Sequence, residues 1–265
     1  TESMPPALAA RIAADPRLAD CPRLHYHVEV SSTNDVAMAL AAAGAPEGTA
    51  VLAAAQRSGR GRQGRAWFSP PGAGLYLSVV ARPPAEAAGL VSLGAGAALA
   101  RAVLAATGLP VELKWPNDLV VGRPWRKLAG VLAEASGVAG RIDSVVVGLG
   151  LNVRVASYPS ELAGCATSLE VELGREVDAD ALVVELMAEM RTCLARLQRH
   201  EIGWVRQEWM RFGRAGLGGT VRWREDATDY RGVAVDIAHD GALLVEHEGA
   251  RRRLVAGEVT WERMS

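Results

Sequence analysis

Short apolar runs separated by turn residues recur along the first part of the chain and constrain its fold more than any other feature. Residues 48–56 (GTAVLAAAQ) and 75–82 (LYLSVVAR) each predict a strand, and residues 111–121 (VELKWPNDLVV) predict two strand halves around a Pro-Asn-Asp turn. Two more strands follow, the first beginning at Lys127 and the second ending near Asn152. Because these strands follow one another like hairpins, with helices between only some of them, the pattern predicts an α+β fold. We expect a mixed sheet flanked by helices and not a doubly wound sheet.

Helices are predicted between some of these strands and after them. The first strand starts at His25 and leads through a polar Ser-Ser-Thr-Asn step into a helix. Residues 87–107 predict a buried helix, and residues 178–200 carry an apolar stripe behind an aspartate cap. After the last helix the chain changes to short strands with turns. We therefore expect a catalytic or binding domain in residues 1–212 and a small strand-rich domain in residues 213–265.

The charge balance excludes a protein that attracts its partner through a basic field over the whole surface. Lys and Arg number 29 against 30 Asp and Glu, which gives a net charge of −1, so any basic site must be local. Three widely spaced cysteines predict neither a disulfide framework nor a cysteine-rich zinc site, and they fit a reducing cytoplasm. The uncharged run between Glu86 and Arg101 is too short for a membrane span, and the N-terminal segment does not resemble a secretory signal. We expect a cytoplasmic protein without membrane contact.

An Arg/Gly loop, residues 59–67 (GRGRQGRAW), lies between two of the predicted strands. Guanidinium groups bind phosphate and carboxylate oxygens in pairs, and glycines let backbone N–H groups approach an anion. In an extended segment Arg60 and Arg62 would project to the same side. The loop alone leaves three uses open: binding a phosphate-bearing small molecule, binding nucleic acid, or serving as a flexible linker. The flanking strands, together with Trp67 and Phe68, favour a loop that folds over a ligand.

Two segments further along place charged side chains next to turns or glycines. The segment KWPND, residues 114–118, presents Asn117 and Asp118 on a predicted turn. Asp118 could orient a metal ion, position an amine, or only close an Asx-turn with its own backbone. Lys127 begins an otherwise apolar strand, and Gly130 follows where a ligand could lie on bare backbone. The alternative for Lys127 is a lysine that protects an edge strand from aggregation.

Three remaining patterns limit the chemistry. GLGLN, residues 148–152, resembles half of a dinucleotide-binding fingerprint but lacks its third glycine and a following helix. We expect instead that these glycines end a strand at a pocket and that the Asn152 side chain enters this pocket. His25 and His27 share one strand face without a third metal ligand, which favours solvated histidines over zinc. No Ser-His-Asp or Cys-His arrangement can be assembled, so the chain offers no nucleophile for covalent catalysis.

Five motifs, in order and spacing, closely resemble those of the biotin protein ligase family. They are SSTN (31–34), QRSGRGRQGRAWFSP (56–70), KWPNDL (114–119), KLAGVLAE (127–134) and GLGLNV (148–153). The resemblance covers about residues 25 to 210, and it implies a class II synthetase-like catalytic domain followed by a small SH3-like β-barrel. Members of this family activate biotin with Mg-ATP to biotinyl-5′-AMP and pyrophosphate, and they then transfer biotin to a lysine of a biotin carboxyl carrier domain. This reaction needs no protein nucleophile.

The resemblance also implies which residues bind the two substrates. The biotin-binding residues would be Ser32, Thr33, Asn34, Gln56, Gly59, Arg60, Gly61, Arg62 and Lys127. The residues that bind ATP and the adenylate would be Arg62, Arg65, Trp67, Asn117, Asp118, Lys127 and Asn152. The catalytic residues would be Arg62, Lys127 and Asp118, with Mg²⁺ as the cofactor and its protein ligands unassigned. Asp118 is assigned to positioning, or deprotonating, the incoming amine of the acceptor lysine.

Two other functions compete with this interpretation. A lipoate ligase is related in fold and also forms an acyl adenylate, but a dithiolane would prefer an apolar floor to the Ser/Thr/Asn corner. A nucleic-acid or regulatory binding module would use the Arg/Gly loop and the small barrel without ATP. Only about two dozen residues precede the first catalytic strand, so the DNA-binding domain of bifunctional ligases is not expected. A homodimer is compatible with the resemblance.

Overall fold

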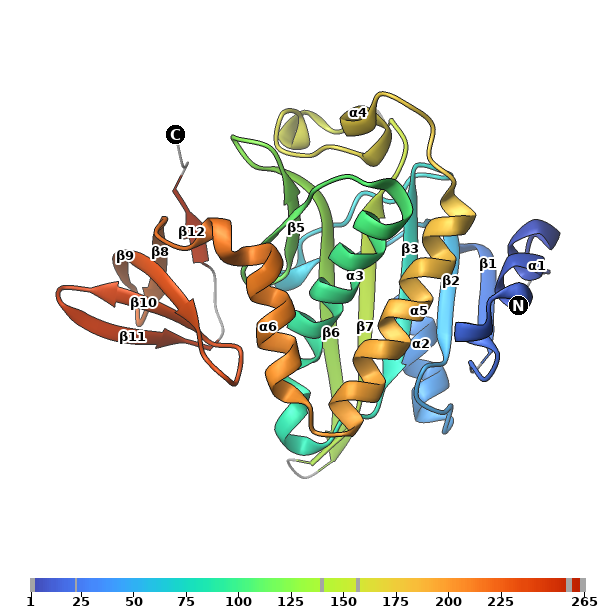
Figure 1. The fold of residues 1–265 in the computed structure, drawn as a ribbon, viewed down its shortest axis with the longest axis horizontal. Helices are drawn as coiled ribbons and strands as arrows, with labels where there is room; N and C mark the ends of the chain where they lie inside the picture. The colour runs from blue at the N-terminus through green and yellow to red at the C-terminus, as the bar shows by residue number, and fades with distance from the viewer. Residues whose placement is uncertain (1–2, 22, 139–140, 156–157, 256–258, 263–265) are drawn as a thin grey trace.

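A seven-stranded mixed sheet forms the centre of the protein in this computed structural model, which describes residues 3–21, 23–138, 141–155, 158–255 and 259–262 (Figure 1). Its strand order is β1-β2-β3-β7-β6-β5-β4. The strands are β1 (Leu24–Val30), β2 (Ala50–Gln56), β3 (Gly74–Ala81), β4 (Glu112–Lys114), β5 (Asp118–Val121), β6 (Arg126–Val138) and β7 (Arg141–Asn152). Only β1 and β2 pair in parallel, and every other neighbouring pair is antiparallel. The predicted α+β fold with a mixed sheet is therefore confirmed.

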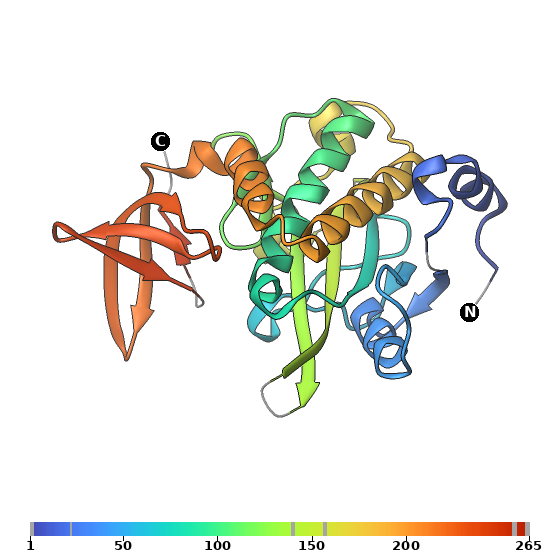
Figure 2. The ribbon, with the colours of Figure 1, turned by 60° about the horizontal axis from the view of Figure 1, so that its bottom comes forward.

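Helices cover both faces of this sheet. The helices are α1 (Pro6–Ala14), α2 (Thr33–Ala42), α3 (Val91–Thr107), α4 (Leu169–Leu173), α5 (Ala179–Gln198) and α6 (Ile202–Gly213). The short 3-10 segments are η1 (Pro16–Leu18), η2 (Arg62–Gly64), η3 (Ala85–Leu90), η4 (Ser160–Leu162) and η5 (Arg214–Gly216). Helices α3, α5 and α6 pack together on one face, where α3 lies against β6 and β7 (Figures 1 and 2). Helix α2 packs on the opposite face.

The alternation of side chains along β7 explains how one strand serves both faces. Val145, Val147 and Leu149 belong to the main core beneath α3, whereas Val146 packs with α2 on the other side. Because successive side chains of a strand point to opposite faces, the positions after Val146 on the α2 side are 148, 150 and 152. The two glycines of the GLGLN motif therefore lie on the α2 face of the sheet.

The most apolar helical stretch of the chain is a core element. Residues Ala85–Thr107, which form η3 and α3, are long and apolar enough to cross a membrane by length and composition, but most of this stretch is buried inside the protein. Gly94 lets α5 approach α3 closely, since a Cβ added there would lie 2.7 Å from the Sγ atom of Cys193. Helix α5 begins at the predicted aspartate cap, where the Asp178 side chain accepts a hydrogen bond from the Ala181 N–H at 3.0 Å.

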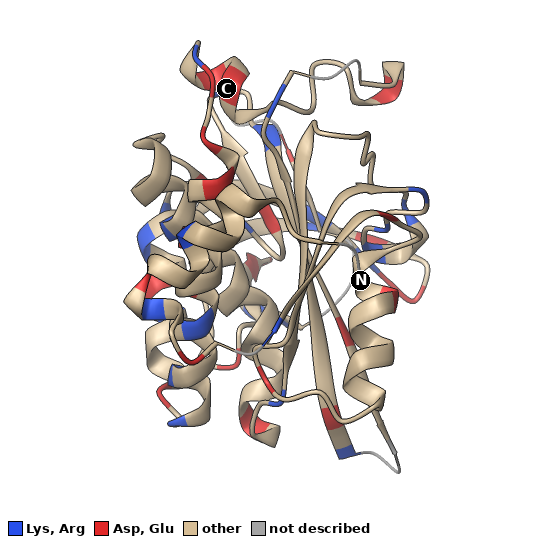
Figure 3. Cartoon of the chain, turned by 90° about the vertical axis from the view of Figure 1, so that its right-hand side faces the viewer, with Lys and Arg blue, Asp and Glu red and all other residues tan. Residues whose placement is uncertain are grey.

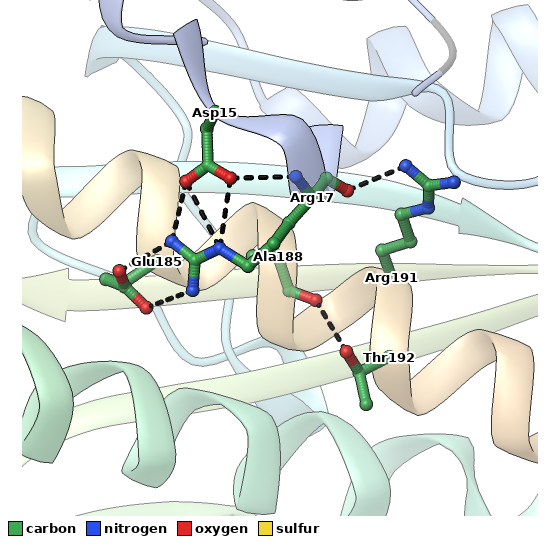
Figure 4. A network of polar contacts seen from close by, with 6 residues as sticks. All are labelled: Asp15, Arg17, Glu185, Ala188, Arg191 and Thr192. Carbon is green, nitrogen blue, oxygen red and sulfur yellow. Dashed lines mark hydrogen bonds and ion pairs between the residues drawn. The ribbon is translucent and has the colours of Figure 1, made fainter. Parts of the chain in front are cut away.

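The N-terminal helix α1 and the segment η1 were not among the predicted elements. Leu8 and Leu18 are buried, and the Arg17 guanidinium bridges the carboxylates of Asp15 and Glu185, the latter on α5 (Figure 4). Arg191 of α5 also donates to the Arg17 carbonyl at 2.7 Å. Tertiary contacts with α5 thus hold this N-terminal segment, and its own weak sequence pattern does not reveal them.

The C-terminal residues form a separate five-stranded antiparallel sheet beside the main domain (Figure 2). Its strands are β8 (Thr220–Glu225), β9 (Thr228–Ile237), β10 (Leu243–His247), β11 (Ala250–Leu254) and β12 (Val259–Trp261), in the order β11-β10-β9-β8-β12. Two tryptophans join it to the large sheet. The Trp115 indole donates to the Gly241 carbonyl at 3.0 Å, and the Trp261 indole donates to the Trp115 carbonyl at 3.1 Å.

Candidate active site

A cavity of about 630 Å³ lies over β6 and β7 on the face of the sheet that carries α2. Its walls come from the start of α2, the Arg/Gly loop after β2, the β4–β5 turn, the segment after β7, and strand β12. All of the predicted site residues except Gly59 line this cavity. They are Ser32, Thr33, Asn34, Gln56, Arg60, Gly61, Arg62, Arg65, Trp67, Asn117, Asp118, Lys127 and Asn152. Five motifs spread over the first part of the chain thus converge on one hollow.

One end of the cavity is a buried polar corner at the first turn of α2. Ser32, Thr33 and Asn34 are each less than 5% exposed. The Gln56 side-chain carbonyl accepts hydrogen bonds from the Thr33 backbone N–H at 2.8 Å and from the Thr33 hydroxyl at 3.1 Å. The Ser32 side chain makes no capping bond to the helix, although Ser32 occupies the N-cap position. Hydroxyl and amide groups are therefore held in place at this end of the cavity.

The Arg/Gly loop is a folded hairpin and not an extended segment. Trp67 N–H donates to the Gly59 carbonyl at 2.8 Å, and Gly61 N–H donates to the Arg65 carbonyl at 2.7 Å. A 3-10 turn, η2, forms the tip. Gly59 itself is buried between the two arms of the hairpin, where an added Cβ would lie 2.7 Å from the Trp67 carbonyl oxygen. Gly59 therefore shapes the loop without lining the cavity.

Because of this turn, Arg60 and Arg62 face different surroundings. Arg60 forms a bidentate ion pair with Asp35 of α2, with distances of 2.5 and 3.0 Å, and its guanidinium also lies 3.5 Å from Glu134. Arg62 is partly buried at the other end of the cavity. Burial lowers the pKa of its guanidinium group, the nearby Asp118 charge raises this pKa, and the Arg65 charge lowers it further. The same-side arrangement of an extended segment therefore does not apply, because the chain reverses at Gln63, whose φ is 57°.

The second end of the cavity collects positive charge around one carboxylate. The Lys127 ammonium lies 2.6 Å from Asp118 Oδ1 and 5.3 Å from the centre of the Trp67 ring. Burial lowers the pKa of Lys114, while the Asp118 charge raises it and the Lys127 charge lowers it further. Among the described residues, Asp118 is the only carboxylate that lines the cavity. The excess of cations over this single anion favours an anionic ligand.

Bare backbone lies between the polar corner and the cations. A Cβ added to Gly150 would lie 2.5 Å from the Trp67 ring, and one added to Gly148 would lie 2.3 Å from the Asn34 side-chain oxygen. Gly130 on β6 is also in contact with Trp67, at 3.2 Å from an added Cβ. The glycines of GLGLN thus make room for two predicted site residues within a strand, and this placement excludes a Rossmann-type turn.

Two predicted nucleotide residues also hold the walls of the cavity together. The Asn117 amide donates to the Val131 carbonyl at 2.7 Å, which fixes the β4–β5 turn to β6. The Asn152 amide donates to the Thr167 carbonyl at 2.9 Å, which fixes the segment after β7. Lys127 is similarly tied to that segment, because its backbone N–H donates to the Cys165 carbonyl at 2.7 Å. The neighbouring strands of β6 are β5 and β7, so Lys127 does not protect a sheet edge.

Several lining residues were missed by the sequence analysis. Trp125 and Tyr158 line the cavity, and so do Val259, Thr260 and Trp261 of β12. Trp125 stacks edge-on against Trp261 with ring centres 5.6 Å apart. No motif marks the C-terminal residues, since their contribution depends on how the small sheet docks; their aromatic composition was the only available signal.

The described residues do not support a metal centre made by protein side chains alone. No group of three or more His, Cys, Asp or Glu residues comes together in the part of the chain that the structure describes. His25 and His27 lie on β1, which is an edge strand of the large sheet. The zinc alternative therefore gains no third ligand from the described residues.

Comparison with known proteins places these features in a family. Residues 27–152 match the profile of the Biotin/lipoate A/B protein ligase family. A biotin–acetyl-CoA-carboxylase ligase of Paracoccus denitrificans is 33% identical over 235 residues, covering 86% of this chain and 96% of the relative. The ligase of the same name from Mycobacterium tuberculosis is 34% identical, covering 89% and 88%. A structure of the biotin protein ligase from Aquifex aeolicus in complex with biotin and ATP is similar with a TM-score of 0.75 and 27% identity, covering 91% of this chain and 99% of that one.

Proposed function

Since this chain belongs to the Biotin/lipoate A/B protein ligase family, we propose that it is a biotin protein ligase. It activates biotin with ATP to biotinyl-5′-AMP and transfers the biotin to a lysine of a carrier domain. The observation that carries this conclusion is the arrangement of the cavity. A buried polar corner stands at one end, a cation cluster around Asp118 at the other, and glycine backbone between them.

The cation cluster suits the first step. A carboxylate oxygen of biotin attacks the α-phosphorus of ATP, a new O–P bond forms, and the bond to the β-phosphate oxygen breaks as pyrophosphate leaves. Both reactants are anionic, so their approach requires positive charge on either side. Lys127 would contact the biotin carboxylate and the α-phosphate, while Arg62 and Arg65 would contact the phosphates. These assignments are supported by the place of the three side chains at one end of the cavity.

The polar corner suits the cyclic urea of biotin. Ser32, Thr33 and Asn34 offer hydroxyl and amide groups that are buried, and Gln56 and Arg60 stand next to them. A ligand without matching polar groups would leave these groups unsatisfied, which is costly in a site that excludes water. Lipoate carries an apolar dithiolane at the corresponding end, so we propose that biotin is preferred over lipoate.

Mg²⁺ would enter together with ATP as part of the substrate. Magnesium is commonly held by one or two carboxylates together with phosphate oxygens and waters. Asp118 provides one carboxylate, and the Asn117 amide, whose NH₂ group is engaged by Val131, provides a side-chain oxygen. These two residues fit such a partial site. Bound there, the ion would neutralise phosphate charge.

The second step needs a neutral amine near the adenylate carbonyl. The acceptor lysine attacks that carbonyl carbon, the C–O bond to AMP breaks, and a proton leaves the amine. We assign Asp118 to positioning this amine and accepting its proton, and Lys127 to holding Asp118 in place through their ion pair. Trp67 and the Arg/Gly loop would shield the mixed anhydride from water until the carrier domain arrives.

The remaining assignments concern the whole chain. We propose a domain boundary between residues 212 and 213, at the end of α6, and a cytoplasmic location. The charge distribution supports a protein that does not act on DNA, because blue and red segments are interspersed over the side shown in Figure 3 and the net charge is −1.

One experiment tests the function directly. The protein is incubated with Mg²⁺, α-labelled ATP and either biotin or lipoate, and labelled adenylate is separated by chromatography. We expect biotinyl-AMP with biotin and little product with lipoate. Adenylate formed only with lipoate would identify a lipoate ligase, and no adenylate from folded protein would contradict both enzymatic functions.

A further inference from the structure

Two side chains behind the polar corner have no part in the function described so far. Ser78 lies on β3 and is fully buried, in the otherwise apolar sequence LYLSVVA. Glu134 lies on β6. Neither is among the described residues that line the cavity. A buried hydroxyl needs a hydrogen-bond partner to offset its desolvation, so the partners of Ser78 are informative.

Ser78 contacts the two residues that form the corner. Its Oγ atom lies 2.7 Å from the Thr33 hydroxyl oxygen and 2.6 Å from Asn34 Oδ1. Ser78 pairs in register with Gly148 of β7, and the missing side chain of Gly148 leaves the space that Asn34 occupies. The hydroxyl and the glycine therefore place Asn34 from two neighbouring strands.

Glu134 fixes which way the Asn34 amide faces. Asn34 Nδ2 donates to the Glu134 carboxylate at 2.6 Å. An ionised carboxylate only accepts hydrogen bonds, so it selects the NH₂ side of the amide and would repel the carbonyl oxygen. The Asn34 carbonyl oxygen is consequently directed to the other side, where Ser78 lies. The orientation of this amide follows from the network around it.

The same network continues to the Arg/Gly loop. Thr33 is bonded to the Gln56 carbonyl oxygen, the Gln56 amide donates to the Ser69 hydroxyl at 3.0 Å, and Ser69 donates to the Trp67 carbonyl at 3.1 Å. Each of these groups is at least partly buried. A polar chain thus runs from Glu134, behind the corner, to the residue that covers the cavity floor.

We propose that Ser78 and Glu134 are positioning residues that set the donor and acceptor pattern of Thr33 and Asn34 for the cyclic urea of biotin. The role rests on the proposed function. A cyclic urea presents one carbonyl acceptor and two N–H donors, so a site that reads it needs side-chain groups of fixed polarity. The acceptor-only carboxylate and the buried hydroxyl supply that polarity through Asn34 and Thr33, without lining the cavity themselves.

The test measures the first half-reaction alone, as biotin-dependent exchange of labelled pyrophosphate into ATP. Ser78→Ala removes one well-placed hydrogen bond, and Glu134→Gln replaces an acceptor-only group by an amide that can turn either its oxygen or its NH₂ group to Asn34 and so no longer fixes it. Each should raise the KM for biotin by roughly tenfold. The kcat and the KM for ATP should stay within about twofold of wild type, because the phosphate end is untouched. Ser136→Ala is the matched control: Ser136 lies on β6 and its hydroxyl bonds only to Ser144, at 2.8 Å, among the described residues.

A double variant separates positioning from general support. Asn34→Asp alone places two carboxylates against each other, and it should raise the KM for biotin more than Glu134→Gln does. In the combination of Asn34→Asp with Glu134→Gln, the new glutamine can donate to the new aspartate, and an acceptor oxygen again faces Ser78. The combination should therefore recover part of the loss caused by Asn34→Asp.

Each contrary outcome has a distinct meaning. A wild-type protein without biotin-dependent exchange would overturn the proposed function, and the role of Ser78 and Glu134 with it. Normal wild-type exchange with an unchanged KM for biotin in both single variants would overturn only their role. A joint fall of kcat, affinity for ATP and melting temperature would show that the two residues merely support the fold, and would overturn the role as well.

Discussion

At the scale of single residues, neighbours in the sequence differ in what they contact. Arg60 is paired with Asp35 at the polar corner, whereas Arg62 is half-buried near Asp118 and Arg65 at the other end of the cavity. Two residues of one motif therefore stand at the two ends that the reaction has to bring together. A substitution at one of them should affect one substrate or intermediate more than the other.

Arg62→Gly should weaken retention of the adenylate more than it slows synthesis. Arg65 and Lys127 still line the phosphate end in this variant, so the α-phosphate keeps most of its countercharge during the first step. We expect release of biotinyl-AMP to increase by roughly tenfold or more, with a smaller loss in pyrophosphate exchange. Filtration of labelled adenylate measures its release. Equal losses in adenylate retention and in pyrophosphate exchange would contradict this difference between the two steps.

Asp118→Asn should slow transfer from preformed adenylate. The amide cannot accept a proton from the acceptor lysine and leaves the Lys127 ammonium without its ion pair. A general base typically contributes a factor of about 10² to 10⁴, so we expect a loss of that order in single-turnover transfer to a carrier domain. Transfer at the wild-type rate would remove Asp118 from this step.

Lys114 should make ATP binding sensitive to alkaline pH. Burial lowers the pKa of Lys114, so this side chain loses its charge at a lower pH than an ordinary lysine, whose pKa is about 10.4. The unfolded chain holds this proton more tightly, so the group's contribution to folding stability rises with pH through that window. Lys114 lines the cavity near Asp118 and Lys127, so we expect the loss of its charge to weaken binding of the nucleotide phosphates. The KM for ATP should rise with pH in the wild type and stay flat in Lys114→Arg. Identical profiles would exclude a contribution of this charge.

At the scale of elements, β7 determines the floor of the cavity. Val145, Val147, Leu149 and Leu151 belong to the core under α3, and the glycines on the other face accommodate Asn34 and Trp67. A strand that is buried on one face can present bare backbone on the other without losing its core contacts. This separation lets the floor be changed without unfolding the sheet.

Gly150→Ala tests this floor. The added Cβ would lie 2.5 Å from the Trp67 ring, so the ring and its loop must move. We expect the KM for biotin to rise by roughly tenfold, with the melting temperature close to wild type because the loop lies at the surface. Gly89→Ala is the control, since no described residue lies within 4 Å of a Cβ added there. A normal KM in Gly150→Ala would show that the position of Trp67 is not critical.

The strands and the helices α2, α3 and α5 could be predicted from the sequence, because hydrophobic period and turn residues are local signals. The convergence of the motifs on one site was implied by their resemblance to the biotin protein ligase family, and helix α6 was not predicted. The hairpin of the Arg/Gly loop could not, since it depends on a residue with positive φ at Gln63 and on contacts to Asp35. Ser78 was hidden within an apolar run, where one small polar residue gives no periodic signal. Its importance emerges only when β3 is placed beside Asn34.

At the scale of the whole molecule, the C-terminal sheet is part of the cavity. Residues of β12 line the cavity, and Trp261 both bonds to the Trp115 carbonyl and packs on Trp125. No motif in the local sequence of β12 marks this role. The small sheet therefore contributes to the site through its docking and not through a motif of its own.

Trp261→Ala should loosen this docking. The variant loses a buried indole, which typically costs about 3 to 5 kcal/mol in a well-packed core, and the hydrogen bond to Trp115. We expect a lower melting temperature and a KM for ATP that rises more than the KM for biotin, since the polar corner lies at the far end of the cavity. Val233→Ala, an exposed position on β9, should change neither KM. Equal effects on both substrates would argue against a selective contribution of β12.

The position of Trp115 has a thermodynamic consequence. This residue lines the cavity within KWPND and also donates its indole N–H to Gly241 of the small sheet. Any ligand whose affinity depends on the placement of Trp115 is linked to the docking of that sheet by one coupling free energy. By reciprocity, the ligand must strengthen the junction by the same factor by which the junction strengthens ligand binding.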